Sequence, residues 1–401
     1  MKRRTTIGAV GIVAASGLVV AVAAFALGGN PGPGPSPIAQ ASPTPTASPG
    51  PTPTATATAT AAPTAVPTAT PLPTPVLVPD PLTGRPVTAD VAARHPIAVM
   101  IDDLGAARPQ SGLASASVVW QAPAEGGIPR YMAIFAENLP TQIGPVRSSR
   151  FYYIAWAAEW RAIYIHSGGS PQALATLRAK GSGQYVYNGD EFRYSGTFFR
   201  VTTRHPPHNL YTTSAKLRSL GKRMGAKDQA YTAAWTFAPD APLEARPYGG
   251  TITVVYPDNT IKYAYDRTTN TYLRSVSVEG KQTDAVDGTR IAPKNVIVMR
   301  MVFGPLNDGH PDKKRLEATV IGSGKAWIST NGRTILGTWK KTAITKPTQF
   351  YDAKGNEIPL TIGQTFVQVV TTSTVSYPVS FTAGSDTPPA SPSPSASPSG
   401  G

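Results

Sequence analysis

Four arginines are concentrated in one part of the chain, among residues that favour turns. They are Arg108, Arg130, Arg147 and Arg150. A guanidinium group can bind a carboxylate or a phosphate through two parallel hydrogen bonds, so this grouping predicts an anion-binding pocket. The dipeptides Gly126-Gly127 and Gly144-Pro145 keep the flanking backbone free of bulky side chains, which favours an open pocket.

Five further residues complete the predicted ligand-binding set: Asp102, Glu125, His166, Ser170 and His208. Ser170 follows Ser167-Gly168-Gly169 and precedes a predicted helix, and the free N–H groups and the dipole at a helix start favour an anion. The alternative is a buried structural network in which the arginines pair with Asp102, Glu125 and Glu159.

Catalysis is the competing interpretation of the same residues. His166 beside Ser167, with Asp102 nearby, supplies the residue types of an acyl-transfer site, and Asp102 with Glu125 supplies the paired carboxylates of a glycosidase. The sequence has no G-x-S-x-G elbow and no S-x-x-K motif matched by a K-T-G partner. An envelope hydrolase or transferase that uses His166 with Ser167 or Asp102 is therefore the alternative to a binding protein.

The sequence predicts neither a metal nor a cofactor. The chain has no cysteine, which excludes thiolate ligands and disulfides. His205 and His208 have an H-x-x-H spacing, but the two prolines between them prevent a helix that could present both rings to one metal. His208 is instead predicted to bond within a turn or to contact a ligand at the rim of the pocket.

Strands and helices must position these residues. Ile97 to Ile101 is a short apolar run that predicts a buried strand ending at Asp102, and Ala162 to His166 predicts another. If these strands are neighbours in one sheet, the turns that follow them meet at its carboxyl edge, where open α/β sheets bind ligands. Helices are predicted over Arg150 to Arg161, Gln172 to Lys180 and Ser214 to Met224. The alternation indicates an α/β domain over residues 80–245.

From residue 246 to 381 the hydrophobic period changes to two. Thr251 to Tyr256, Thr260 to Tyr265 and Thr271 to Val278 predict a meander, and further strands follow without a convincing helix. This region is predicted to be a mainly antiparallel β domain, either a sandwich or a barrel.

The two ends of the chain differ in composition from the rest. Lys2, Arg3 and Arg4 precede an apolar run, so residues 1–29 predict a signal anchor, or a signal peptide cleaved near Ala26. The basic end stays inside, which predicts a single-pass protein of the bacterial cell membrane with extracytoplasmic domains, or a secreted one. Residues 30–79 predict a disordered Pro, Thr and Ala linker, and residues 382–401 a disordered tail.

The formal net charge of the 401-residue chain is +14, which favours anionic partners. Outside a membrane these are cell-wall polymers and lipid headgroups rather than nucleic acid. The alternative is that the charge only keeps the protein soluble.

Nine short motifs resemble the DUF3048, or YerB-like, family. They are PLTG (81–84), AVMIDD (98–103), ARPQSGL (107–113), EGGIPR (125–130), IGPVRSSR (143–150), HSGGSP (166–171), PHNLYT (207–212), KNVIVM (294–299) and GTWKK (337–341). The resemblance implies an α/β domain followed by a β-rich domain, and it implies no particular activity. Many relatives are lipoproteins, so a protein anchor would replace the lipid in this cysteine-free chain. Relatives commonly carry Asn where this chain has Asp103.

These observations predict a membrane-anchored envelope protein that binds an anionic ligand, such as a peptidoglycan fragment or a phosphate-bearing polymer, in an arginine-rich pocket. A purely structural partner of other wall proteins is a third class of function that the sequence allows.

Overall fold

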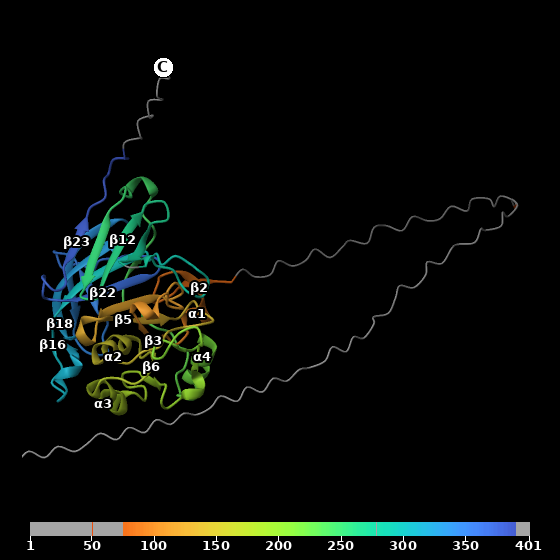
Figure 1. Cartoon of the computed structure of the whole chain (residues 1–401). Coiled ribbons are helices and arrows are strands. Elements are labelled where there is room, and N and C mark those ends of the chain that lie inside the picture. The colour runs from red at the N-terminus through yellow and green to blue at the C-terminus, as the bar shows by residue number, and fades with distance from the viewer. Residues whose placement is uncertain (1–49, 51–74, 278, 390–401) are drawn as a thin grey trace, which may run out of the picture. The chain divides into compact units, whose positions relative to one another are not determined.

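The computed structural model describes residues 50, 75–277 and 279–389, and Figure 1 shows the chain. The predicted signal segment at residues 1–29 lies outside the described residues. Most of the predicted linker and residues 390–401 of the predicted tail also lie outside them.

A ten-stranded sheet runs through the folded part of the chain. Its strand order is β20-β19-β18-β15-β22-β4-β5-β3-β6-β7. The N-terminal half contributes β3 (Ile97–Asp102), β4 (Val118–Pro123), β5 (Pro129–Phe135), β6 (Ile163–His166) and β7 (Tyr187–Asp190). The C-terminal half contributes β15 (Asn295–Met301), β18 (Gly322–Thr330), β19 (Arg333–Lys341), β20 (Gln349–Tyr351) and β22 (Thr365–Thr371). The two halves therefore share one sheet, which joins at the parallel pair β22 and β4.

A second, five-stranded sheet belongs to the C-terminal half and has the order β14-β13-β12-β11-β23. Its strands are β11 (Thr251–Tyr256), β12 (Asn259–Asp266), β13 (Thr271–Val276), β14 (Gly280–Lys281) and β23 (Val379–Thr382). All its pairings are antiparallel. In Figure 1 this sheet, with β12 and β23 labelled, lies at the opposite end of the molecule from α3.

Helices lie mainly in the N-terminal half. The longer ones are α2 (Phe151–Ala157), which continues as the 3-10 turn η3 (Ala158–Trp160), α3 (Pro171–Lys180) and α4 (Ser214–Arg223); α1 (Ala89–Ala92) is a single turn. The sequence predicted all three longer helices. Ser170 caps α3 as predicted, since its hydroxyl accepts a hydrogen bond from the Ala173 N–H at 3.3 Å.

The remaining elements are short. They are β1 (Leu77–Pro79), β2 (Pro86–Thr88), η1 (Gly105–Ala107), η2 (Glu125–Gly127), η4 (Ser195–Thr197), β8 (Phe199–Arg200), β9 (Leu210–Tyr211), β10 (Phe237–Ala238), η5 (Leu243–Ala245), β16 (Phe303–Pro305), η6 (Pro311–Lys313), β17 (Leu316–Ala318) and β21 (Leu360–Thr361). Strands β16 and β17 form a hairpin that contacts α2.

The core divides along the two faces of the large sheet, because successive side chains of a strand point to opposite faces. One face packs against α2, where the Trp120 and Trp156 rings stack with centroids 4.6 Å apart. The other face packs in its N-terminal half against α4. In its C-terminal half it packs against the five-stranded sheet, through residues such as Val298 and Tyr263. The C-terminal region is thus a β sandwich.

A buried ion pair ties the two halves together. Lys341 Nζ lies 2.8 Å from Glu159 Oε1, and both side chains are fully buried. Thr348 donates a further hydrogen bond to the same carboxylate at 2.7 Å. The predicted fold class, an α/β region followed by a mainly antiparallel β region, is confirmed. The boundary near residue 245 stays a prediction, because the large sheet crosses it.

Within residues 75–277 and 279–389, no helix has the length and apolar character needed to cross a bilayer.

Candidate functional site

The candidate site lies where β3 and β6 end. These strands are parallel neighbours, as the sequence analysis required. The segment around Arg147 fits between their ends: the Arg147 N–H donates to the Met100 carbonyl at 3.0 Å, and the Ser167 N–H donates to the Arg147 carbonyl at 3.1 Å. Backbone hydrogen bonds therefore place Arg147 between the turns that follow Asp102 and His166.

Asp102 is the buried carboxylate at this edge, with an exposed fraction of 2%. Its Oδ2 lies 3.0 Å from Arg147 Nε and 2.6 Å from His208 Nδ1. The Leu104 N–H donates to Oδ1 at 3.3 Å. The side chains of Arg147 and His208 are 22% and 16% exposed, so solvent reaches the outer side of this group.

Glu125 forms the second carboxylate centre, in the turn η2 between β4 and β5. Arg130 Nη2 lies 2.9 Å from Glu125 Oε2, and Arg150 Nη2 contacts Glu125 Oε1. Arg130 is the second residue of β5 and lies directly opposite Asp102 in the register of β3 and β5. We call Asp102, Glu125, Arg130, Arg147 and Arg150 the arginine cluster.

Several polar atoms of the arginine cluster are buried and form no hydrogen bond with any described residue. Arg130 Nη1 and Arg150 Nε are two of them, and Arg147 Nε is near Asp102 without hydrogen-bond alignment. Glu125 Oε2 likewise lies 2.9 Å from Arg130 Nη2 without hydrogen-bond alignment. Burial lowers the pKa of Arg150 and of Arg147, although Asp102 opposes the shift at Arg147. The cluster holds three cations against two carboxylates.

Arg108 does not belong to the cluster, contrary to the prediction of one four-arginine pocket. Its Nε lies 3.1 Å from Asp103 Oδ1, and its Nη1 donates to Glu279 Oε1 at 3.0 Å. Asp103 follows Asp102 and faces the opposite side of the sheet, because strand side chains alternate. Arg108 therefore fixes the N-terminal half to the β13–β14 hairpin.

His166 and the glycine-rich turn are occupied by internal hydrogen bonds. The buried His166 ring has Nδ1 2.8 Å from the Gly168 carbonyl and Nε2 2.7 Å from Asn188 Oδ1. The Ser167 hydroxyl donates to Glu191 rather than to His166. The N–H groups of Gly168 and Ser170 donate to Asp190 Oδ1 and to the Ser149 carbonyl. The expectation of free amides in this turn is wrong for these groups, and Ser170 Oγ serves as the helix cap.

The alternative of a structural network is realised in part. Asp102 and Glu125 pair with arginines as that alternative predicted, whereas Glu159 pairs with Lys341. The sequence did not indicate the partner of Glu159, because Lys341 is far away in the chain. Only the strand order of the large sheet brings Lys341 close to Glu159.

A second polar group on the opposite face of the sheet escaped the sequence analysis. We call Asp103, Arg108, Gln121, Arg274 and Gln282 the sealed network. Arg274 is fully buried; it donates to Tyr263 Oη at 3.0 Å, to Gln121 Oε1 at 2.6 Å and to Gln282 Oε1. Gln121 donates to Asp103 Oδ2. One signal was present: Arg274 occupies an inward position of a predicted strand, between Tyr272 and Val276.

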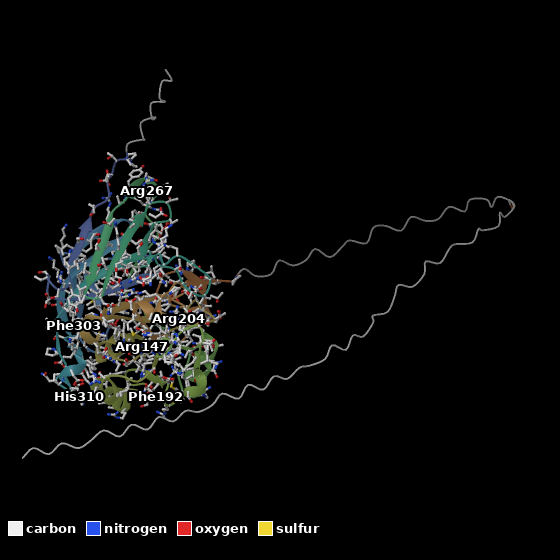
Figure 2. All side chains as sticks on the ribbon, in the orientation of Figure 1. Arg147, Phe192, Arg204, Arg267, Phe303 and His310 are labelled. Atoms are coloured by element: carbon white, nitrogen blue, oxygen red, sulfur yellow. The ribbon has the colours of Figure 1, made fainter. Side chains whose placement is uncertain are left out.

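Of five hollows in the surface of the described residues, one is lined by predicted site residues, and none of the five is lined by Arg130, Arg147 or Arg150. Arg108 and His208 line a hollow of about 430 Å³ together with Arg204 and His205. Figure 2 labels Arg204 and Arg147 on this side of the molecule. Arg204 donates to the carbonyls of Ala106, Arg108 and Pro109, so its guanidinium holds that loop in place.

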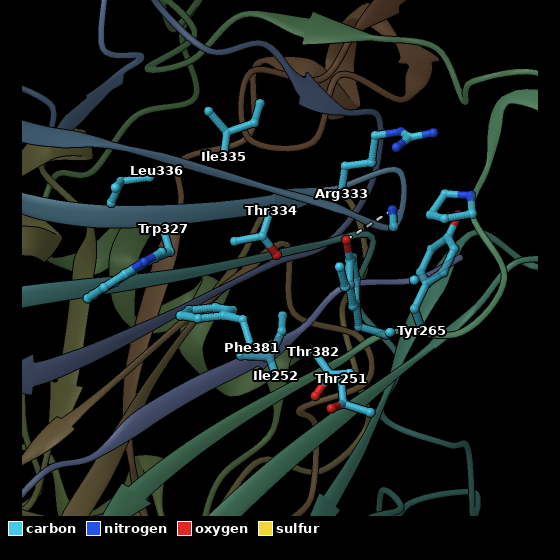
Figure 3. Close-up of a pocket in the computed structure, with 16 residues that line it drawn as sticks. Thr251, Ile252, Tyr265, Trp327, Arg333, Thr334, Ile335, Leu336, Phe381 and Thr382 are labelled. Carbon is cyan, nitrogen blue, oxygen red and sulfur yellow. Dashed lines mark hydrogen bonds between the residues drawn. The ribbon is translucent and has the colours of Figure 1, made fainter. Parts of the chain in front are cut away.

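Another hollow, of about 560 Å³, opens between the two sheets. Figure 3 shows Trp327 beside Phe381 at one end and Tyr265 near Arg333 at the other. It contains no predicted site residue. Among the described residues no group of three or more His, Asp or Glu side chains could hold a metal ion.

Two family models match the chain in order. They are described as the N-terminal domain of a protein of unknown function (DUF3048), over residues 82–228, and the DUF3048 C-terminal domain, over residues 252–367. The chain belongs to the DUF3048 family. The resemblance found in the sequence motifs is thereby confirmed for both halves.

The relatives agree with this assignment. The chain is 32% identical to the candidate lipoprotein YerB of Bacillus subtilis (strain 168) over 298 residues, which cover 72% of this chain and 85% of YerB. It is also similar to the crystal structure of the Bacillus subtilis YerB protein. That match has a TM-score of 0.66 and 26% sequence identity, and it covers 75% of this chain and 98% of the other.

Proposed function

We propose that this member of the DUF3048 family is a membrane-anchored, extracytoplasmic envelope protein that binds an anionic ligand at the arginine cluster. A peptidoglycan fragment, through its carboxylates, and a phosphate-bearing polymer are the two ligand classes that fit this chemistry.

The observation that carries the proposal is the surplus of guanidinium donors at a partly exposed place. Arg130 Nη1 and Arg150 Nε are buried and lack a protein partner, and a buried donor without a partner costs about 1–3 kcal/mol. A bound carboxylate or phosphate would accept from such donors. Glu125 is 26% exposed and Arg147 22% exposed, so the outer side of the cluster borders solvent.

Two observations support the envelope location. The related YerB is named as a candidate lipoprotein, which is a class of membrane-attached protein. The basic residues and apolar run at the start of this chain would provide a protein anchor in place of a lipid.

The test is a titration of the purified full chain by calorimetry with muramyl dipeptide and, separately, with poly(glycerol phosphate). We expect one of the two to bind, and we expect Arg147→Ala and Arg130→Gln to weaken binding at least tenfold, since each removes a charged hydrogen-bond donor. Arg178→Ala is the matched control, because it removes the same charge from an exposed position of α3.

Binding that is equal in the parent, Arg147→Ala and Arg178→Ala would place the ligand elsewhere and reject the proposal. Failure of both ligands to bind the parent would reject it as well.

The Asp102–His208 pair favours a second candidate function, an envelope hydrolase or transferase. A buried carboxylate 2.6 Å from Nδ1 orients an imidazole as in acid–base catalysis, and His208 lines a hollow. His166, which the sequence suggested for this role, has both ring nitrogens occupied. Hydrolysis of ester, amide or glycan probes that is lost in His208→Ala and kept in His205→Ala would favour this function; inactivity of the parent on all three would reject it.

A further inference from the structure

A basic hollow of about 620 Å³ lies beside α4, at the turn that contains η4. Three of its lining residues are cationic, Arg193, Lys216 and Arg223, and none of its lining residues is acidic. Ser195 and Ser219 add hydroxyl groups to the lining. The arginine cluster differs, because carboxylates already occupy part of it.

The fold of α4 directs these groups outward. Lys216, Ser219 and Arg223 are spaced three and four residues apart and share one face of the helix. The buried face of the helix carries Leu217 and Leu220, which are fully buried. Gly221 allows that face to approach β6 closely, since a Cβ atom there would lie 2.2 Å from Ile163 Cδ1.

The three cations are not neutralised within the described part of the protein. None of them forms an ion pair with a described residue. Lys216 Nζ donates to the Gly196 carbonyl at 3.2 Å, and Arg223 Nη1 donates to Ser219 Oγ at 3.1 Å. The Arg193 guanidinium lies 5.2 Å from the centre of the Tyr194 ring. Each cation is therefore held in place by neutral groups and keeps further donors free.

The carboxylates nearest in sequence to Arg193 form hydrogen bonds with residues outside the basic hollow. Glu191 Oε1 accepts from Arg200 at 2.9 Å, and its other oxygen accepts from Ser167. Asp190 Oδ1 accepts from the Gly168 N–H at 3.2 Å. Among the described residues, therefore, no carboxylate lines the basic hollow or pairs with its three cations.

We propose that the basic hollow binds consecutive phosphodiester groups of an anionic polymer chain. Three cations spread over a helix and a neighbouring turn match several singly charged phosphates along a chain better than one isolated anion. A flexible polymer chain can bend into a concave surface, whereas the flat surface of a bilayer cannot enter it. This site is separate from the arginine cluster, so it stands whether or not the cluster binds a ligand.

The experiment is calorimetric titration of the purified full chain with poly(glycerol phosphate), with a neutral glycerol oligomer as the ligand control. Parent binding is expected to weaken as salt rises, because counterions compete for the cations. Lys216→Gln and Arg223→Gln should each weaken binding about fivefold, the effect of one cation near an anionic surface. Lys222→Gln is the matched variant: it removes the same charge from the same helix outside the hollow.

Four results would overturn the proposal. The first is absence of binding by the parent, and the second is equal weakening by Lys222→Gln, which would indicate that only net charge matters. The third is weakening by Arg147→Ala but not by Lys216→Gln, which would place the polymer at the arginine cluster. The fourth is binding of phosphatidylglycerol nanodiscs without binding of the polymer, which would indicate a lipid surface. Unchanged thermal unfolding of the Gln variants confirms that they are folded.

Discussion

Asp102 and Asp103 are consecutive residues of the same type in two different environments. Asp102 faces the arginine cluster, where its partners Arg147 and His208 are partly exposed. Asp103 faces the sealed network, where Arg108 is 5% exposed and Arg274 is fully buried. The end of one strand therefore supplies a carboxylate to each side of the sheet.

The difference between the two environments indicates which charged groups have hydrogen-bonding capacity left for a ligand. In the sealed network the Arg274 guanidinium donates to three side chains, and Gln282 also donates to Gln110 at 3.0 Å. In the arginine cluster the guanidinium groups of Arg130 and Arg150 keep buried nitrogens without a partner. We expect substitutions in the network to affect stability and substitutions in the cluster to affect binding.

The largest expected effect is that of Arg274→Ala. Removing one member of a buried charged group leaves the others without compensation, which typically costs 3–5 kcal/mol, and we expect a loss of about that size in the free energy of unfolding. Urea denaturation measures it. Lys262→Ala, on the exposed side of the neighbouring β12, is the control and should change stability by less than about 0.5 kcal/mol. Similar losses in both variants would contradict the sealed network.

His166→Ala should have the next largest effect. The ring is fully buried and bonds through both nitrogens, so its loss should lower the free energy of unfolding by about 2–3 kcal/mol. His208→Ala, which removes a partly exposed ring, should cost about 1 kcal/mol or less. The same denaturation experiment compares them, and a reversed order would show that the two histidines have been assigned the wrong roles.

Measurements of stability at several pH values test Asp103 separately from Asp102. Burial raises the pKa of Asp103 above its ordinary value of 3.8, although Arg108 and Arg274 oppose the shift. The native state holds this proton more tightly than the unfolded chain, so the stabilising contribution is fully present below pH 3.8 and is lost as the pH rises through the raised pKa.

Asp103→Asn removes this titration. The unfolding free energy of the parent minus that of the variant should therefore fall as the pH rises from about 3 to about 6. Urea titrations at several pH values measure the difference, and a constant difference would contradict the raised pKa.

Arg147→Ala should lower stability less than Arg274→Ala and His166→Ala. Its ion pair with Asp102 is partly exposed and Asp102 keeps two other partners, so the loss should be about 1 kcal/mol or less. Binding of the anionic ligand should nevertheless fall at least tenfold. A variant that loses more stability than His166→Ala would move Arg147 from the binding group to the structural one.

Local sequence was sufficient to predict β3, β6 and the three longer helices around the site. The apolar run before Asp102 forms β3, and the Ser170-Pro171 pair starts α3, because burial pattern and helix capping depend on neighbouring residues. Whether β3 and β6 are neighbours was left open by the sequence, and the structure pairs them in parallel. The residue with which each arginine pairs was not predicted.

The sequence by itself determined the family, most of the longer strands and helices, and the concentration of four arginines between residues 108 and 150. Only the tertiary structure decided that Arg108 meets Glu279 across the two halves, while Arg130 and Arg150 share Glu125. The physical reason is that an ion pair depends on strand order and on which face of the sheet a residue occupies. A shift of one residue, from Asp102 to Asp103, changes that face and with it every partner.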